Sequence, residues 1–440
     1  MRYYLARFKV VGIKNLDQKI QLDFCDKTLR SHLDWSQSNI KAIYGSNGSG
    51  KSAIMNAMAI YKELVMNSNY LYDHETTLFL SEIINKKTRK LQMEVTFLIL
   101  NAQAQIQTIL IHSVCLKQTG FKDFVIAEEQ LKKHTGQTLD TGKTQTLYHV
   151  EEGSLKSSDF KEIESLKTMT ANLMKKQTIP AILIQHTIEN KAQIPLSTFI
   201  KNILSVYFFA EALHIELSTS DLHRGWIRQK QKQLSDWTLD DLREETSSAS
   251  FEFNTEDDVI PIPAYPQYQR QIQRLAEFIQ IFKMDLLGIE NECKEVQGNL
   301  VITKYLVYKD FRIASEFEST GIKKLITLFN AFKSFMNGDL VFIDELDANL
   351  HDVYLCRLLD YFCAYGKGQL CFTTHNLGPM EVLSKRKHSI DFLSDNSEII
   401  SWKKKGNYSV INLYRNGMID NSPFNIEPFD FLGLFEDEDQ

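Results

Sequence analysis

The chain has 440 residues, 43% hydrophobic and 24% charged, which excludes both a single small module and a disordered protein. Its 56 acidic residues outnumber its 50 basic residues, and the net charge of −6 argues against a protein that coats DNA through a basic surface. Six scattered cysteines without C-x-x-C spacing, no signal-peptide pattern and no long apolar run predict a cytoplasmic protein with no membrane contact.

The first 60 residues alternate between strand and turn signals and end in a helix. Tyr3–Val11 and Lys19–Phe24 alternate apolar and polar residues, which predicts two half-buried strands. A polar stretch separates them from Ile40–Tyr44, a short apolar run that predicts a buried strand and is followed by a glycine. The composition of Lys51–Tyr61 then predicts a helix.

The middle of the chain changes from β-rich to helical. Met93–Leu100 and Gln107–Cys115 predict strands of a small sheet, and Lys161–Lys176 and Leu196–Leu213 predict helices. Leu239–Asp258 is rich in Ser, Glu and Asp, which predicts a mobile linker.

Gln267–Cys293 has the clearest helical period in the chain. Its apolar residues recur at steps of three and four: Ile272, Leu275, Ile279, Phe282, Leu286 and Ile289. This pattern predicts one helix with a single apolar seam. The seam spans fewer heptads than a coiled coil needs, so packing on its own domain and pairing with a partner helix both remain open.

Short apolar strands and helices alternate again after Val301. Helices are predicted at Ile322–Met336 and Asp352–Tyr365. Strands are predicted at Val301–Val307, Leu340–Ile343, Leu370–Thr373, Asp391–Leu393, Ile399–Trp402 and Ser409–Leu413. Such alternation predicts an α/β fold with a largely parallel sheet.

A glycine-rich turn between the third predicted strand and the first helix fits the P-loop pattern G-x-x-x-x-G-K-[ST]. Its residues are Gly45, Ser46, Asn47, Gly48, Ser49, Gly50, Lys51 and Ser52. Glycines let backbone N–H groups surround phosphate oxygens, and the helix N-terminus adds partial positive charge. The turn therefore predicts binding of ATP, with Lys51 on the β- and γ-phosphates and Ser52 on Mg²⁺.

Two acids and a histidine follow later strands. Asp344 and Glu345 come directly after Leu340–Ile343, and we expect Asp344 to hold Mg²⁺ and Glu345 to orient or deprotonate the attacking water. His375 follows the strand that contains Leu370–Thr373. Because carboxyl ends of parallel strands meet at one edge of a sheet, we expect His375 to donate a hydrogen bond to a phosphate oxygen.

This order of motifs resembles that of ABC-type ATPases, most of all the branch with the SMC proteins, the zinc-hook repair ATPases and RecF. Gly12–Leu16 is similar to the N-terminal segment of that branch. The resemblance implies that Ser319 and Gly321 act as the signature, contacting ATP on a second copy. Thr320 and Ile322 depart from the usual signature. Asp347 and Asn349 lie in the segment that corresponds to the D-loop.

The resemblance divides the chain into an interrupted head, an insertion and a tail. Residues 1–100 and 300–415 are the expected two parts of the ATPase head. Residues 101–299 are the insertion, β-rich and then helical, and residues 416–440 are an aromatic and acidic tail. An insertion of this length is similar to that of compact ATPases of prokaryotic antiphage defence, of abortive-infection, retron-associated and restriction-sensing types.

The expected activity is therefore ATP hydrolysis in a homodimer or larger homo-oligomer that controls a partner effector, such as a nuclease or toxin. No nuclease residues are recognised within the chain itself. A repair or chromosome-maintenance ATPase that binds duplex DNA is the alternative, with basic clusters at Lys86–Lys90, Arg228–Lys232 and Lys403–Lys405. A nucleotide-dependent scaffold with negligible turnover is a third. The tail from Phe424 to Phe435 either packs on the core or docks a partner.

Overall fold

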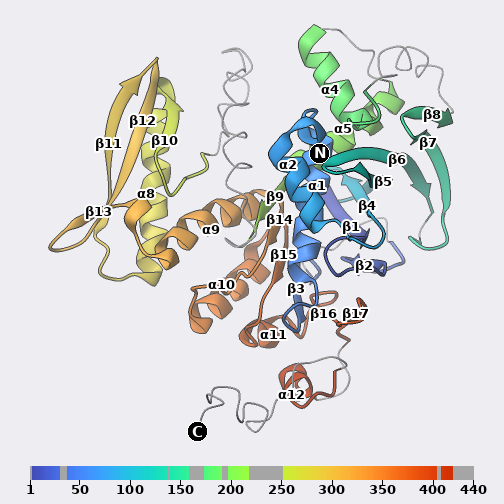
Figure 1. Cartoon of the computed structure of the whole chain (residues 1–440). Helices are drawn as coiled ribbons and strands as arrows, with labels where there is room; N and C mark the ends of the chain where they lie inside the picture. The colour runs from blue at the N-terminus through green and yellow to red at the C-terminus, as the bar shows by residue number, and fades with distance from the viewer. Residues whose placement is uncertain are drawn as a thin grey trace, which may run out of the picture.

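The computed structural model describes residues 2–29, 37–136, 138–157, 173–190, 197–217, 251–403 and 408–419 (Figure 1). Several predicted segments lie wholly or mostly outside these ranges: the helix Lys161–Lys176, the first part of the linker Leu239–Asp258, the basic cluster Arg228–Lys232 and the C-terminal tail. No helix among the described residues is long and apolar enough to cross a bilayer.

A six-stranded sheet forms the centre of the molecule, with strand order β17-β16-β3-β15-β14-β9. Its strands are β3 (Ile40–Gly45), β9 (Leu213–Glu216), β14 (Leu340–Ile343), β15 (Gln369–Thr373), β16 (Ile390–Leu393) and β17 (Ile399–Ser401). All neighbours are parallel except β16 and β17. The prediction of a largely parallel sheet is confirmed, and β9 is a strand that the sequence did not indicate.

A second, antiparallel sheet has strand order β2-β1-β4-β5-β6-β7-β8. It contains β1 (Arg2–Val11), β2 (Ile20–Asp23), β4 (Lys90–Leu100), β5 (Ile106–Gly120), β6 (Asp123–Thr135), β7 (Lys143–Glu151) and β8 (Ser154–Ser157). The predicted strands in these regions are confirmed, but the sheet is larger than expected. β4 and β5 pair from Lys90↔Lys117 to Leu100↔Ile106, so the division expected at residue 100 lies inside one continuous sheet.

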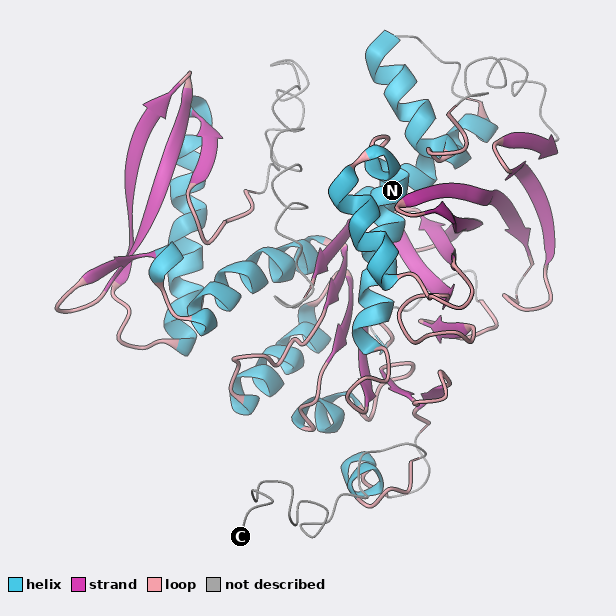
Figure 2. Ribbon diagram, viewed as in Figure 1, coloured by secondary structure: helices cyan, strands magenta, loops and turns pink. Residues whose placement is uncertain are grey.

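Helices α1 (Lys51–Met66) and α5 (Thr198–Glu211) pack in the core that the two sheets share. Phe209 of α5 stacks on Phe97 of β4 with ring centroids 4.4 Å apart. Figure 2 shows α1 between the parallel strands and the antiparallel sheet. Two further helices, α2 (His74–Ile83) and α4 (Ile179–Asn190), lie at the outer end of this part.

A buried polar junction joins α1 to the antiparallel sheet. Tyr61 of α1 lies 2.9 Å from His112 Nδ1, and His112 Nε2 lies 3.1 Å from Glu129 Oε1. The Glu129 carboxylate also accepts hydrogen bonds from the Tyr148 hydroxyl at 2.7 Å and from the Ile179 amide at 3.0 Å. Buried polar groups are costly unless paired, and here α1, three strands and the start of α4 supply the partners.

The opposite face of the parallel sheet is covered by α9 (Thr320–Asn337), α10 (Asp352–Tyr365) and α11 (Gly378–Leu383). The predictions of α9 and α10 are confirmed. The predicted strand Ser409–Leu413 is wrong, because the chain there forms helix α12 (Val410–Arg415). Its apolar residues lie three and four positions apart, and Tyr414 stacks on Phe392 at 5.4 Å, which suits a helix.

A smaller lobe projects from the N-terminal start of α9 and consists of one helix on an antiparallel sheet (Figure 1). Its sheet has order β10-β12-β11, with β13 beside β12. The elements are β10 (Asp258–Pro261), α8 (Tyr265–Phe282), β11 (Gly288–Val296), β12 (Asn299–Val307) and β13 (Arg312–Ala314). The predicted strand Val301–Val307 is confirmed, but it pairs antiparallel in this lobe and not in the parallel sheet.

The helix predicted over Gln267–Cys293 is correct only for its first part. Helix α8 ends at Phe282, Leu286 lies in the turn, and Ile289 belongs to β11 opposite Leu306. The apolar residues still reach one core, because Ile289 packs against it from the strand. The seam of α8 packs on its own lobe, as one of the two open alternatives predicted.

Candidate functional site

The glycine-rich turn connects the central strand β3 to helix α1. Gly48 and Gly50 have φ of 80° and 107°, a region that side chains disfavour. A Cβ atom on Gly50 would lie 2.5 Å from Leu16 Cδ2, so a larger residue would also clash. The turn therefore has the tight strand-to-helix geometry that the P-loop pattern requires, with its amides at the start of α1.

Lys51 lies inside this turn and faces the acids of the sheet edge. Its Nζ donates to Gly45 O at 2.9 Å and Ser46 O at 2.8 Å. Burial lowers the pKa of Lys51, and the charges of Asp344 and Glu345 oppose that shift. The ammonium group is thus held beside the loop that we expect to bind phosphates, next to the carboxylates that we expect to serve the metal.

The N-terminal turn at Gly12–Leu16 supports the P-loop from outside. Asn15 Nδ2 donates to Gly48 O at 2.6 Å, and Leu16 lies against Gly50. Sequence reasoning linked this segment to the site only through family resemblance. On the other side, the Ser46 hydroxyl donates to the Asp395 carboxylate, a contact that no sequence pattern indicated.

Asp344 and Glu345 follow β14 and are organised by one buried hydroxyl. Thr373 Oγ1, at the end of the neighbouring strand β15, donates to Asp344 Oδ1 at 2.6 Å and accepts from the Glu345 amide at 2.7 Å. Glu345 has φ of 51°, so its backbone is strained and needs this support. Thr373 was missed because a threonine in a β-rich strand carries no distinguishing signal.

His375 lies two residues beyond Thr373 at the same edge of the sheet. Its side chain is exposed, and its pKa is lowered by partial burial and by the positive charge of Lys51. The charges of Asp347, Glu345 and Asp344 act in the opposite direction. The structure therefore brings Lys51, both acids after β14 and His375 to one edge.

Ser319 and Gly321 lie at the start of α9, next to the D-loop segment. The Ser319 side chain caps α9 by accepting from the Ile322 amide at 3.4 Å. A Cβ atom on Gly321 would lie 3.8 Å from Asn349 O, and Asn349 itself has φ of 65°. Ser319 is exposed, and among the described residues no hydrogen bond joins it or Gly321 to the P-loop.

The residues of this edge fit a triphosphate with Mg²⁺. Two buried oxygens, Ser49 Oγ and Asp344 Oδ2, have no hydrogen-bond partner within the described part of the chain. Ser52 follows Lys51 in the first turn of α1. Over the same residues, no three His, Cys, Asp or Glu side chains gather as a metal site. A single carboxylate and a hydroxyl match Mg²⁺, which keeps waters and phosphate oxygens as its remaining ligands.

Comparison with known proteins locates the matching part of the chain. Residues 220–381 match the model of a family described as "AAA domain, putative AbiEii toxin, Type IV TA system". This range contains Ser319, Gly321, the acids after β14 and His375, and it excludes the P-loop. No curated protein shows significant similarity to the sequence.

Two solved structures are similar in outline. One is the Smc head domain from Pyrococcus furiosus, with an extended coiled coil and bound to the C-terminal domain of ScpA. The two sequences are 13% identical, the match covers 91% of this chain and 96% of that one, and the TM-score is 0.42. The other is the Smc head domain with a coiled coil and joint from Pyrococcus yayanosii, at 11% identity, 91% and 97% coverage and a TM-score of 0.39.

The site's own geometry and the family match point to one class of protein. The P-loop lies between a central parallel strand and a helix, and the carboxylates end the strand two positions away in the sheet. The intervening strand ends in Thr373 and leads to His375. This arrangement is similar to the nucleotide-binding edge of P-loop ATPases with an ABC-type α/β fold, and the part of the edge within residues 220–381 also matches the AAA-domain family model.

Proposed function

We propose that the protein binds and hydrolyses ATP·Mg²⁺ in a composite site formed by two copies of the chain. The observation that carries this proposal is the exposure of Ser319 at the start of α9, where Gly321 lies beside Asn349. Within the described ranges, no hydrogen bond joins Ser319 to its own P-loop. In the proposed pair, Ser319 and Gly321 of one copy face the γ-phosphate of ATP on the P-loop of the other.

The residues of the sheet edge have distinct proposed roles. Lys51 and the P-loop amides bind the phosphates, while Ser52 and Asp344 hold Mg²⁺, which neutralises charge on the phosphates. Glu345 orients the attacking water and accepts its proton. His375 donates a hydrogen bond to a phosphate oxygen. Asp347 and Asn349 contact the second copy.

Glu345→Gln tests this proposal most directly, because it keeps the shape of the side chain and removes the base. We expect ATP binding to persist, hydrolysis to fall by about 10²–10⁴-fold, and ATP to trap a dimer or larger oligomer in sedimentation. Lys51→Ala is the matched control that is expected to lose both nucleotide binding and assembly. Normal turnover by Glu345→Gln would remove Glu345 from its role, and negligible turnover by the wild type would favour a scaffold.

We further propose that assembly controls a partner effector in antiphage defence, such as a nuclease or toxin. Support comes from the family description, which names a putative toxin of a toxin–antitoxin system. The test is a plaque assay with the native operon, in which Lys51→Ala and deletion of the neighbouring gene are each expected to abolish protection. Protection by the chain alone would contradict control of a partner.

A DNA-binding ATPase is the second candidate function. The cluster Lys86–Lys90 is exposed on the turn before β4, which favours it. Two of these lysines already lie 3.4 Å from carboxylates, Lys86 from Glu82 and Lys87 from Asp17. Duplex binding that falls steeply with salt, with a slope reduced by Lys86→Ala, would support this function over effector control.

A further inference from the structure

The short segment before the signature presents an aromatic side chain to solvent on a rigid backbone. Phe317 ends a one-turn helix, Ser315–Phe317, and its side chain is 72% exposed. Ser319 follows two residues later and begins α9 as its cap. A large apolar side chain at such a position is informative because exposure of apolar area to water is unfavourable.

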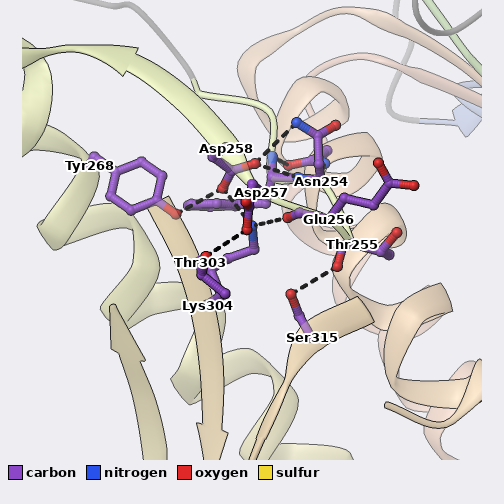
Figure 3. Close-up of polar contacts among 11 residues, drawn as sticks. Asn254, Thr255, Glu256, Asp257, Asp258, Tyr268, Thr303, Lys304 and Ser315 are labelled. Carbon is purple, nitrogen blue, oxygen red and sulfur yellow. Dashed lines mark hydrogen bonds and ion pairs between the residues drawn. The ribbon is translucent and has the colours of Figure 1, made fainter. Parts of the chain in front are cut away.

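A set of hydrogen bonds through residues 255–258 connects the start of the segment Ser315–Phe317 to the lobe (Figure 3). Ser315 Oγ donates to Thr255 O at 2.8 Å. Lys304 Nζ donates to Glu256 O at 2.7 Å and to Asp258 Oδ2 at 2.9 Å, and this ion pair is almost fully buried. Tyr268 donates to the same Asp258 oxygen at 2.8 Å. Residues 255–258 thus join α8, β12 and the turn before Phe317.

The same stretch is tied to the signature helix further along. Asn330 of α9 accepts from the Phe253 amide at 2.9 Å and donates to Phe253 O at 2.8 Å. Residues 253–255 of the lobe therefore contact both the residues that precede α9 and the middle of α9 itself. We expect the lobe, Phe317 and Ser319 to move as one body.

Phe317 and Ser319 are separated by one residue, and both are exposed to solvent. Glu318, with φ −68° and ψ 165°, has a polyproline II-like backbone and is the single residue that separates Phe317 from Ser319. The Glu318 carboxylate accepts from the Tyr308 hydroxyl of the lobe at 2.5 Å and from the Ser319 amide at 2.9 Å, which fixes this residue between the lobe and α9. Phe317 is thus held beside Ser319 and is not folded back onto the lobe.

We propose that Phe317 packs, in trans, on the nucleotide-binding face of a second copy of this chain, beside the P-loop that receives Ser319. This inference rests on the proposed composite site and extends it by one residue outside the signature. The partner surface is that of the second copy, because Phe317 is only two residues from Ser319 and must lie close to any surface that Ser319 contacts. In this arrangement, the hydrogen bonds between the lobe and the start of α9 fix the positions of both residues relative to the second copy.

The test measures ATP-dependent self-association of full-length Glu345→Gln by sedimentation, with and without Phe317→Ala. Burying one phenylalanine contributes about 10- to 100-fold per site, so with two sites the dimer dissociation constant is expected to rise by about 10²- to 10⁴-fold. Phe317→Leu, which keeps most of the apolar area, is expected to restore most of the affinity. Phe121→Ala is the matched control, since Phe121 is 86% exposed in the β5–β6 turn.

A mixing experiment separates action in trans from a structural effect. Labelled Lys51→Ala mixed with Phe317→Ala leaves one composite site intact, whereas the Lys51→Ala/Phe317→Ala double variant mixed with wild type leaves none. We expect ATP-dependent heterodimers in the first mixture and markedly fewer in the second. Equal association in both mixtures, or a Phe317→Ala dissociation constant equal to that of Phe121→Ala, would overturn this inference alone. Absence of any ATP-dependent assembly of Glu345→Gln would instead overturn the composite site on which it rests.

Discussion

Replacing Thr373 by valine removes the hydroxyl that organises both acids after β14 while keeping the branched shape. The variant loses the hydrogen bond to Asp344 at 2.6 Å and the one from the Glu345 amide at 2.7 Å. A bond to a charged group contributes about 1.5–3 kcal/mol, and a buried group left without a partner costs about 1–3 kcal/mol. We therefore expect the free energy of unfolding to fall by about 2–5 kcal/mol.

The same variant is expected to lose catalysis beyond its loss of stability. Glu345 sits at φ 51°, and without the Thr373 contact its carboxylate no longer has a fixed position. Turnover at saturating ATP should approach that of Glu345→Gln, while the affinity for ATP measured without Mg²⁺, which depends on the P-loop, changes little. Urea denaturation and a steady-state phosphate-release assay measure the two effects.

Thr178→Val is the control for this experiment. Thr178 is fully buried and donates one neutral hydrogen bond, to Leu64 O at 3.0 Å, far along α1 from the P-loop. Its loss is expected to cost about 0.5–1.5 kcal/mol with no change in turnover. The reasoning is refuted if Thr373→Val is no less stable than Thr178→Val and hydrolyses ATP at the wild-type rate.

Two further predictions concern the P-loop and pH. In Gly50→Ala, the new side chain sits at a φ of 107° and clashes with Leu16, so nucleotide affinity should fall by roughly 5- to 150-fold in a binding titration. The control is Gly298→Ala, at a φ of 81° with open space around it, which should leave nucleotide affinity unchanged. Burial lowers the pKa of Lys333 to about 8, so the unfolded chain binds more protons above that pH, and stability should rise from pH 8 to 10.5. Lys333→Met should lack this rise in urea denaturation, and a constant difference between the two proteins would contradict the assignment.

The central sheet could be predicted because its strands are short, apolar and bounded by turn signals. β3, β14 and β15 lie where the runs Ile40–Tyr44, Leu340–Ile343 and Leu370–Thr373 indicated. The apolar runs of buried parallel strands are continuous and hence easy to recognise. β9 begins at Leu213, where the predicted helix Leu196–Leu213 ends, and it is too short for a strand pattern of its own; its pairing with β14 makes it a strand.

The errors have a common physical origin in ambiguous periodicity. The steps of three and four that define α8 continue by coincidence to Ile289, although Asp285 and Gly288 interrupt the helix. Residues 409–413 are too few to separate a strand from a helix by pattern alone. In the site, the P-loop and the two acids were recognisable from residue type and spacing, whereas Thr373 and Asn15 act through contacts that only the fold creates.

The strand order of the parallel sheet has a consequence for synthesis on the ribosome. β3, which carries the P-loop, ends at Gly45, and both of its neighbours, β15 and β16, come from the last quarter of the chain. At a translation rate of about 5–20 residues per second, β15 and β16 are synthesised roughly 15–65 s after β3. The antiparallel sheet is complete long before, so it can shelter α1 in the nascent chain. The nucleotide site is therefore among the last parts to form, and a truncated translation product would carry the P-loop sequence without a competent site.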